Sequence, residues 1–261
     1  MKTLIQIEFL KLWKLGTFRI MMLVYALALP LIIIGLGNLP IPLPFMPDLK
    51  QVASFPNIWA YGAYGAGWMN LLVALVIVII TSNEIKYRTL KQNVIDGLSK
   101  QQVIFSKFYL VLILSSIITT YTFLTCLVFG FIYSDNYAIF DGIYPIGIYF
   151  LQTIGYFSFA FFLTILLRLP ALSIILFICS FALESILGLI AIPQHIYAYF
   201  PLNTLSSLTP FPLFREMIEQ TRKHSGEIIY VLEPNMRIVI GFIYISIFIT
   251  ASYFILKRRD L

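Results

Sequence analysis

Six long apolar runs constrain the fold of this 261-residue chain more than any other feature. Each run is close to the ~20 residues that a helix needs to cross the hydrocarbon core of a bilayer. In lipid the backbone N–H and C=O groups must be satisfied internally, and a helix does so within one segment. The period-two alternation of an outer-membrane barrel is absent. The predicted spans are Ile20–Leu36, Trp59–Thr81, Val103–Tyr133, Ile146–Leu167, Ala171–Ala191 and Arg237–Leu256.

Composition excludes a soluble fold. Apolar residues make up 60% of the chain and charged residues only 11%, whereas a soluble domain carries about 25% charged residues. We therefore expect an all-α polytopic membrane protein with six transmembrane helices, in which residues 1–261 form a single transmembrane domain. Cys126 and Cys179 both fall within predicted spans, so we expect no disulfide and no metal site.

The basic residues are distributed unevenly between the two ends of the predicted spans. With the N-terminus inside, 13 of the 18 lysines and arginines lie on the cytoplasmic side. The other five are Lys50, Arg215, Arg222, Lys223 and Arg237. This bias is the positive-inside rule, and it predicts cytoplasmic N- and C-termini. Attraction to the anionic inner surface of the membrane accounts for the net charge of +6 without a nucleic-acid partner.

The first nineteen residues favour an amphipathic helix at the membrane interface. Apolar residues recur at helical spacing, and charged residues occupy the opposite face. The apolar residues are Ile5, Phe9, Leu12 and Trp13, and the charged ones are Glu8, Lys11 and Lys14. Such a helix would place Trp13 at headgroup depth. The alternative is a positively charged flank that only sets topology.

A polar island, Ser82–Lys107, separates the second and third apolar runs, and residues 82–103 form the predicted cytoplasmic loop. Leu90, Val94 and Leu98 recur at i, i+4 and i+8, which indicates one apolar helix face. Gly97 is suited to end that helix in the left-handed conformation. Ser99 and Gln102 then have capping-box spacing for the next helix. We expect a helix, a sharp break and a capped helix, although an ordinary loop with a solvated basic face would also fit.

Two polar residues inside the spans are candidates for a substrate pathway. Asn70 follows a glycine-rich start of the second span and is expected to hydrogen-bond to a neighbouring helix. Glu184 is a carboxylate deep within the fifth span, where an anion costs about 2.5–3.5 kcal/mol. It fits a site for a cationic substrate or a proton relay, or a structural carboxyl bonded to a backbone carbonyl or to Ser180.

The island resembles the loop between the second and third spans of ABC-2 type permeases, the membrane subunits of one class of ABC exporter. The matching positions are Glu84, Thr89, Gly97, Ser99 and Lys107. The segment RTLKQNVIDGLSK is similar to the corresponding loop in a branch of small six-span permeases that includes lantibiotic-immunity-like members. The ending Phe254–Leu261 also resembles the family's terminal signature. One departure is Arg88, where many members have glycine.

The resemblance implies that the island holds a coupling helix, which sits in a cleft of a separate nucleotide-binding ATPase subunit. It also implies that Glu84 braces the bend that the island makes between its helices. It also implies a second permease copy or a paralogue, and short re-entrant helices within an external segment, residues 192–235. ATP and magnesium would be bound by the partner, with no cofactor in this chain. The candidate coupling residues are Glu84, Arg88, Thr89, Leu90, Asn93, Val94, Gly97, Leu98 and Ser99.

Other function classes have less support. The sequence contains no G-x-x-x-x-G-K-[ST] phosphate loop, so ATP-driven transport would require a partner. His195 and His224 are the only histidines, and both lie in the predicted external segment, so we expect no catalytic site. A secondary transporter or channel that uses Glu184 is the main alternative. A membrane-embedded enzyme and a non-transporting sensor or immunity subunit that binds an ATPase also remain open.

Overall fold

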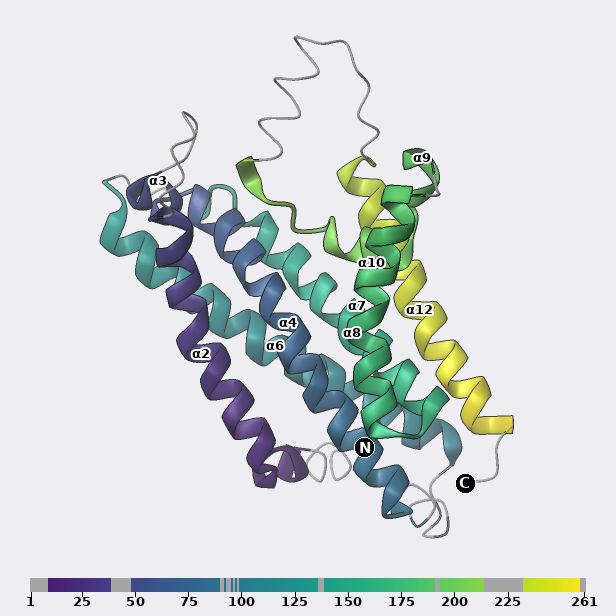
Figure 1. Cartoon of the computed structure of the whole chain (residues 1–261). Coiled ribbons are helices and arrows are strands. Elements are labelled where there is room, and N and C mark those ends of the chain that lie inside the picture. The colour runs from purple at the N-terminus through teal and green to yellow at the C-terminus, as the bar shows by residue number, and fades with distance from the viewer. Residues whose placement is uncertain are drawn as a thin grey trace.

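The computed structural model describes residues 9–38, 48–89, 92, 95, 97, 99–135, 139–190, 193–213 and 232–258, and all regular secondary structure in these ranges is helical. Six of the described helices are long and apolar enough to span a membrane. They are α2 (Gly16–Gly37), α4 (Asn57–Lys86), α6 (Lys100–Tyr133), α7 (Tyr144–Leu167), α8 (Pro170–Ile190) and α12 (Pro234–Arg258) (Figure 1). The predicted all-α fold with six apolar helices is confirmed, and each predicted run coincides with one helix to within a few residues.

Helices α4 and α7 form the centre of the bundle. They pack against each other more extensively than any other pair, and α7 also contacts α6, α8 and α12. Helices α2, α8 and α12 lie at the perimeter, and most of their apolar surface is unburied within the chain. These long helices expose apolar side chains, and such a surface suits contact with lipid.

Glycines near the start of α4 let the neighbouring helices approach closely, as the sequence predicts. A Cβ atom on Gly62 would lie 2.2 Å from the Sγ atom of Cys126 in α6. One on Gly65 would lie 2.9 Å from the Cγ2 atom of Ile32 in α2. Helices α6 and α2 can therefore pack this closely against α4 only because Gly62 and Gly65 have no side chains.

A buried polar chain joins α2, α4, α6 and α7. The hydroxyl of Tyr149 donates to the Oδ1 atom of Asn70 at 2.9 Å, which confirms the predicted interhelical bond of Asn70. The same hydroxyl lies 2.9 Å from that of Tyr25, which lies 2.7 Å from the Oγ1 atom of Thr122. Because a polar group in an apolar interior is costly unless it is bonded, this chain favours one relative placement of the four helices.

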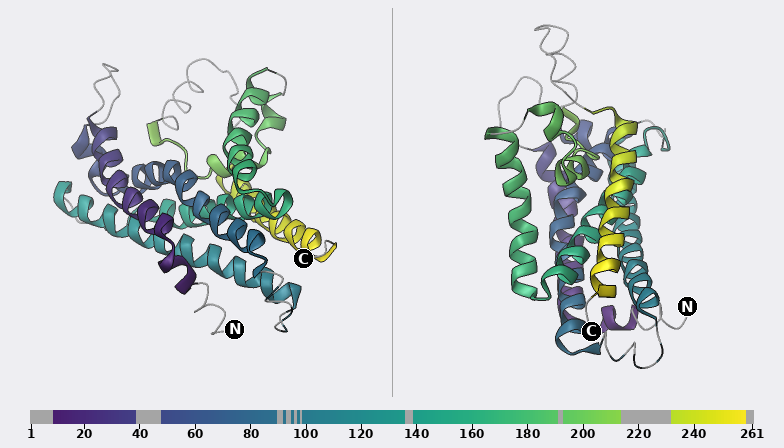
Figure 2. Two further views of the ribbon diagram at one scale, coloured as in Figure 1. Left: turned by 60° about the horizontal axis from the view of Figure 1, so that its bottom comes forward. Right: turned by 90° about the vertical axis from the view of Figure 1, so that its right-hand side faces the viewer.

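The end of the bundle that contains the α4–α6 connection also contains residues 9–14, the α7–α8 turn and the end of α12 (Figures 1 and 2). We call the connection, Tyr87–Ser99, the elbow, and this end of the molecule the elbow end. The opposite end contains α3 (Leu49–Ala53) and two short helices, α9 (Gln194–Tyr197) and α10 (Pro201–Ser206). We call residues 193–209 the hairpin, and that end the hairpin end.

Replacing Tyr149 by Phe should lower the stability of the bundle, because Asn70 and Tyr25 lose the hydroxyl that joins them. We expect a loss of about 1 kcal/mol, since interhelical hydrogen bonds in membranes are modest. Thermal unfolding in detergent measures it. The matched control is Tyr64→Phe, because no hydrogen bond of the Tyr64 hydroxyl is found among the described residues and its ring contact with Phe211 is kept. Equal unfolding temperatures for the two variants would contradict the prediction.

Candidate functional site

The elbow begins with a helix terminator at the end of α4. Tyr87 is the C-cap, and Arg88 follows it in the left-handed conformation with φ 54°. The amide of Arg88 donates to the carbonyl of Ile85 at 3.2 Å, and the hydroxyl of Thr89 donates to the carbonyl of Glu84 at 3.2 Å. The first of these is a bond of the Schellman motif, in which the left-handed position is usually glycine.

Beyond this terminator the chain turns helical again and then breaks a second time. Thr89, Gln92 and Ile95 are helical, and the amide of Gln92 donates to the carbonyl of Arg88 at 3.0 Å. Gly97 has φ 99°, a conformation that residues with a side chain rarely adopt. The break that the sequence predicts at Gly97 is therefore present.

The predicted capping box at the start of α6 is also confirmed. The Oγ atom of Ser99 accepts from the amide of Gln102 at 3.2 Å, and the Oε1 atom of Gln102 accepts from the amide of Ser99 at 2.9 Å. The neighbouring Gln101 donates from Nε2 to the hydroxyl of Tyr253 in α12 at 3.0 Å. The capping box therefore fixes the direction in which α6 leaves the elbow. The bond between Gln101 and Tyr253 connects the start of α6 to α12.

A buried ion cluster lies directly behind the elbow. Glu84, in the last turn of α4, is 6% exposed, and Lys107 of α6 is 2% exposed. The Oε1 atom of Glu84 accepts from the Nζ atom of Lys107 at 2.6 Å and from the Nζ atom of Lys11 at 3.0 Å. One carboxylate oxygen therefore joins α4, α6 and the helical residues 9–14. The Oε2 atom of Glu84 has no hydrogen-bond partner among the described residues.

The structure brings together those of the predicted coupling residues that it describes. Glu84, Arg88 and Thr89 form the terminator and the ion cluster, while Gly97 and Ser99 form the second break and the cap. The remaining predicted residues, Leu90, Asn93, Val94 and Leu98, lie outside the described residues.

Three residues of this site escaped the sequence analysis in their actual roles. Lys11 was assigned to the polar face of an interfacial helix, yet it pairs with Glu84, 73 positions later. No local spacing could have revealed that contact. Tyr87 and Ile95 are both 68% exposed, and they are the large apolar side chains that the described part of the elbow presents to its surroundings.

Glu84→Ala should destabilise the protein by about 3–5 kcal/mol, because the Lys107 ammonium would remain buried without its counter-ion. The double variant Glu84→Gln/Lys107→Met should recover much of that loss, because neither charge remains. Chemical unfolding in detergent measures both. The control is Asp135→Asn in the exposed Lys50–Asp135 pair, which should change little. A double variant no more stable than Glu84→Ala would contradict the assignment.

The two left-handed positions predict opposite effects of substitution. Arg88→Gly should be tolerated or should stabilise by about 1 kcal/mol, because glycine adopts positive φ without the strain of a side chain. Gly97→Val should destabilise the elbow through its backbone alone, since a Cβ atom there would meet nothing within 4 Å. Protease sensitivity of the segment 87–99, with unfolding temperature measured in parallel, reports both. Equal sensitivity in the two variants would show that backbone conformation does not govern the elbow.

The two candidate pathway residues lie in different surroundings. Asn70 is fully buried in the polar chain between α4 and α7, and its Nδ2 atom has no partner among the described residues. Glu184, in α8, accepts the backbone amides of Leu202 and Asn203 in α10, at 3.2 Å and 2.6 Å. The Ser180 hydroxyl instead donates to the carbonyl of Phe177. Glu184 therefore caps a neighbouring helix, a role that the sequence analysis did not consider.

Tyr197, at the hairpin end, lies close enough to Glu184 to respond to its charge. Tyr197 belongs to α9, and burial raises the pKa of its phenol, with the nearby Glu184 carboxylate adding to the rise. The ring of Tyr197 also packs close to Gly188, one turn beyond Glu184 in α8. The carboxylate thus lies beside both short helices of the hairpin.

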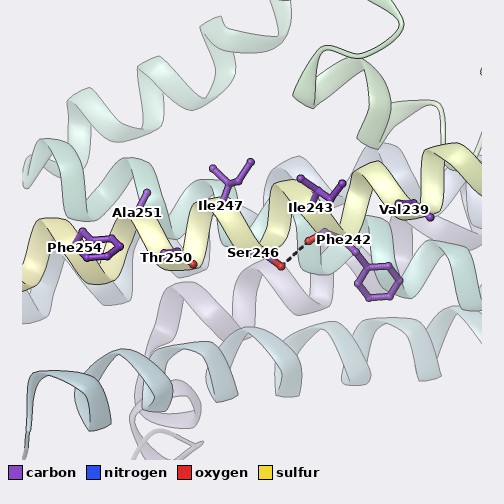
Figure 3. Close-up of a pocket in the computed structure, with 8 residues that line it drawn as sticks. All are labelled: Val239, Phe242, Ile243, Ser246, Ile247, Thr250, Ala251 and Phe254. Atoms are coloured by element: carbon purple, nitrogen blue, oxygen red, sulfur yellow. Dashed lines mark hydrogen bonds between the residues drawn. The ribbon is translucent and has the colours of Figure 1, made fainter.

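A groove of about 710 Å³ runs along one face of α12 (Figure 3). All of its lining residues belong to that single helix, and none is charged. They are Val239, Phe242, Ile243, Ser246, Ile247, Thr250, Ala251 and Phe254. The Ser246 hydroxyl donates to the carbonyl of Phe242 in its own helix. The groove suits contact with lipid or another apolar helix, because six of its eight lining residues are apolar.

Comparison of the sequence with models of known protein families finds no match, and comparison with curated proteins finds none either.

Proposed function

We propose that the chain is the membrane-spanning permease subunit of an ATP-driven exporter of the ABC-2 type. In this proposal the elbow is the coupling element that docks into a separate nucleotide-binding ATPase subunit. The observation that carries the proposal is that all five positions of the resemblance have a physical role in the elbow or directly behind it. Glu84 and Lys107 form its buried ion pair, Thr89 satisfies the last turn of α4, and Gly97 and Ser99 make the break and the cap.

The departure from the family pattern supports the same proposal. Many ABC-2 type permeases have glycine where this chain has Arg88, and Arg88 adopts the left-handed conformation. Glycine is the residue that this conformation favours, because it lacks the Cβ atom that clashes with the backbone. The backbone of this chain therefore has the shape that the family's glycine would permit, although the residue differs.

The proposed mechanism follows from the attachments of the elbow. A force applied to residues 89–95 would reach α4 through the terminator and α6 through the capping box. Because the Glu84–Lys107 pair ties these two helices together at the elbow end, they would move as one unit. Movement of a rigid helix pair against the rest of the bundle is an established kind of switching transition. ATP binding in the partner would supply the force, and this chain would contribute no ATPase activity.

The remaining features of the proposal concern the membrane. The basic residues at the elbow end favour its placement in the cytoplasm of a bacterial cell, with both termini on that side of the inner membrane. The segment before α2 would lie along the inner interface, where its Lys11 pairs with Glu84 at the end of α4. A second permease copy or a paralogue would complete the transport pathway.

The main alternative is an ATP-independent transporter or channel that uses Glu184. It has less support, because each oxygen of the Glu184 carboxylate already accepts a backbone amide of α10. Transport that persists after ATP depletion and requires a proton gradient would favour it.

The decisive experiment is a pull-down of the tagged chain from native membranes in mild detergent, followed by mass spectrometry. We expect a stoichiometric soluble subunit with a phosphate-loop sequence. That subunit should be lost from Leu90→Asp/Val94→Asp and weakened by Ile95→Asp, since a charge on the docking surface opposes apolar contact.

Phe140→Asp is the matched control, because Phe140 is a 73% exposed apolar residue in the connection at the hairpin end. Retention of the ATPase by Phe140→Asp and its loss from the elbow variants would support the proposal. Recovery of the chain alone, under conditions that keep a known ABC complex intact, would overturn it in favour of the Glu184 transporter.

A further inference from the structure

The last helix ends in two basic residues at the elbow end of the bundle. Lys257 and Arg258 occupy the final positions of α12, and both side chains are exposed. The Nζ atom of Lys257 lies 5.9 Å from the ring centroid of Tyr253, whose hydroxyl accepts from Gln101 of α6. A cation over an aromatic face is attracted to the ring. The basic end of α12 is therefore held at a defined position beside the start of α6.

The groove along α12 has a floor of small side chains. Ser246 and Thr250 lie one helical turn apart, with Ile243 and Ile247 to one side of them and Phe242 to the other (Figure 3). The Ser246 hydroxyl donates to the carbonyl of Phe242 in the same helix, so it needs no partner from outside. The groove therefore suits a flexible apolar chain, which can follow its branched and aromatic walls.

The basic residues continue the line of the groove. Lys257 follows Thr250 by seven positions, and Arg258 follows Phe254 by four. Residues at these spacings lie on one face of a helix. The lining runs from Val239 to Phe254, roughly 22 Å at about 1.5 Å per residue. That length exceeds half of a hydrocarbon core of about 30 Å. The groove thus leads from two cations at the elbow end to beyond the middle of the membrane.

Helix α2 offers a comparison within the same molecule. It too has exposed basic residues at the elbow end, Lys14 just before it and Arg19 in its first turn, and it too presents an apolar face outwards. That face consists of large aliphatic side chains, whereas α12 places Ser246 and Thr250 between its large ones. The exposed aliphatic residues of α2 include Ile20, Leu23, Leu27 and Leu31.

We propose that the groove and the basic pair together bind one anionic phospholipid of the leaflet at the elbow end. An acyl chain would lie in the groove, and the phosphate would accept charge-assisted hydrogen bonds from Lys257 and Arg258. The charges favour a lipid over a second spanning helix, because an apolar helix in the groove would bring no anion to the two cations. The proposal does not rest on the exporter assignment, since lipid surrounds any chain that spans a membrane.

The test uses a phosphatidylglycerol probe with a photoreactive diazirine in its acyl chain. The full chain is reconstituted in phosphatidylcholine nanodiscs that contain a small fraction of the probe, and mass spectrometry of the fragments maps the label after illumination. We expect the label to concentrate on residues 239–254 of α12 rather than on α2. The matching phosphatidylcholine probe should label the two helices equally, because its headgroup has no net charge.

Two sets of variants separate the contribution of charge from that of shape. Lys257→Gln/Arg258→Gln should lower the phosphatidylglycerol labelling of α12 at least about fivefold, because attraction between each basic residue and the anionic headgroup is lost. Ser246→Leu/Thr250→Leu should also lower it, since leucine fills the floor of the groove and leaves the charges in place. Both pairs of side chains are exposed, so the fold should be retained. The matched control is Lys14→Gln/Arg19→Gln, which removes two exposed charges from the same end and should leave the labelling of α12 unchanged.

Three outcomes would overturn the proposal. Equal phosphatidylglycerol labelling of α2 and α12 would show that the groove selects nothing. Equal labelling of α12 by the two probes would show that the basic pair does not recognise an anion. The third outcome concerns an Ile243→Cys variant in a chain with Cys126→Ala and Cys179→Ser. Efficient disulfide formation between two copies of that variant in nanodiscs would mean that a second chain, and not a lipid, covers the groove.

Discussion

The constraint that shapes this protein is that lipid offers no hydrogen bonds to a polypeptide backbone. Six long helices satisfy it for most of the chain. The difficult places are those where a helix stops inside or near the membrane, because its last groups lose their intrahelical partners. At two of these places side chains supply what the backbone lacks: Thr89 and Ser99 do so at the elbow, and Glu184 and Arg237 do so at the hairpin.

The elbow and the hairpin use charge in different ways. At the elbow, Glu84 pairs with a buried ammonium group of Lys107, so the charges hold two long helices to each other. At the hairpin, no ion pair between Glu184 and Arg237 is found among the described residues. Each of them instead interacts with one end of the short helix α10. The first arrangement favours common motion of α4 and α6, whereas the second fixes a small element between two spanning helices.

Local pattern in the sequence was sufficient for the helices and for the sharpest features of the elbow. Apolar run length predicted every span, the Ser99–Gln102 spacing predicted the capping box, and Gly97 predicted the second break. Local pattern could not predict which distant segments contact each other. No spacing pattern in the sequence predicts the Lys11–Glu84 pair or the Glu184 cap, because both contacts depend on how the helices pack. The sequence alone also does not predict the left-handed conformation of Arg88, since arginine rarely adopts it.

The ion cluster also has a consequence for the order in which the chain is made. Synthesis from the N-terminus delivers Lys11 first, then Glu84, and Lys107 23 residues later. The carboxylate therefore emerges with one basic partner already present, and it gains the second only when α6 begins to form. Of the two lysines that pair with Glu84, only Lys11 is therefore available before α6 is made.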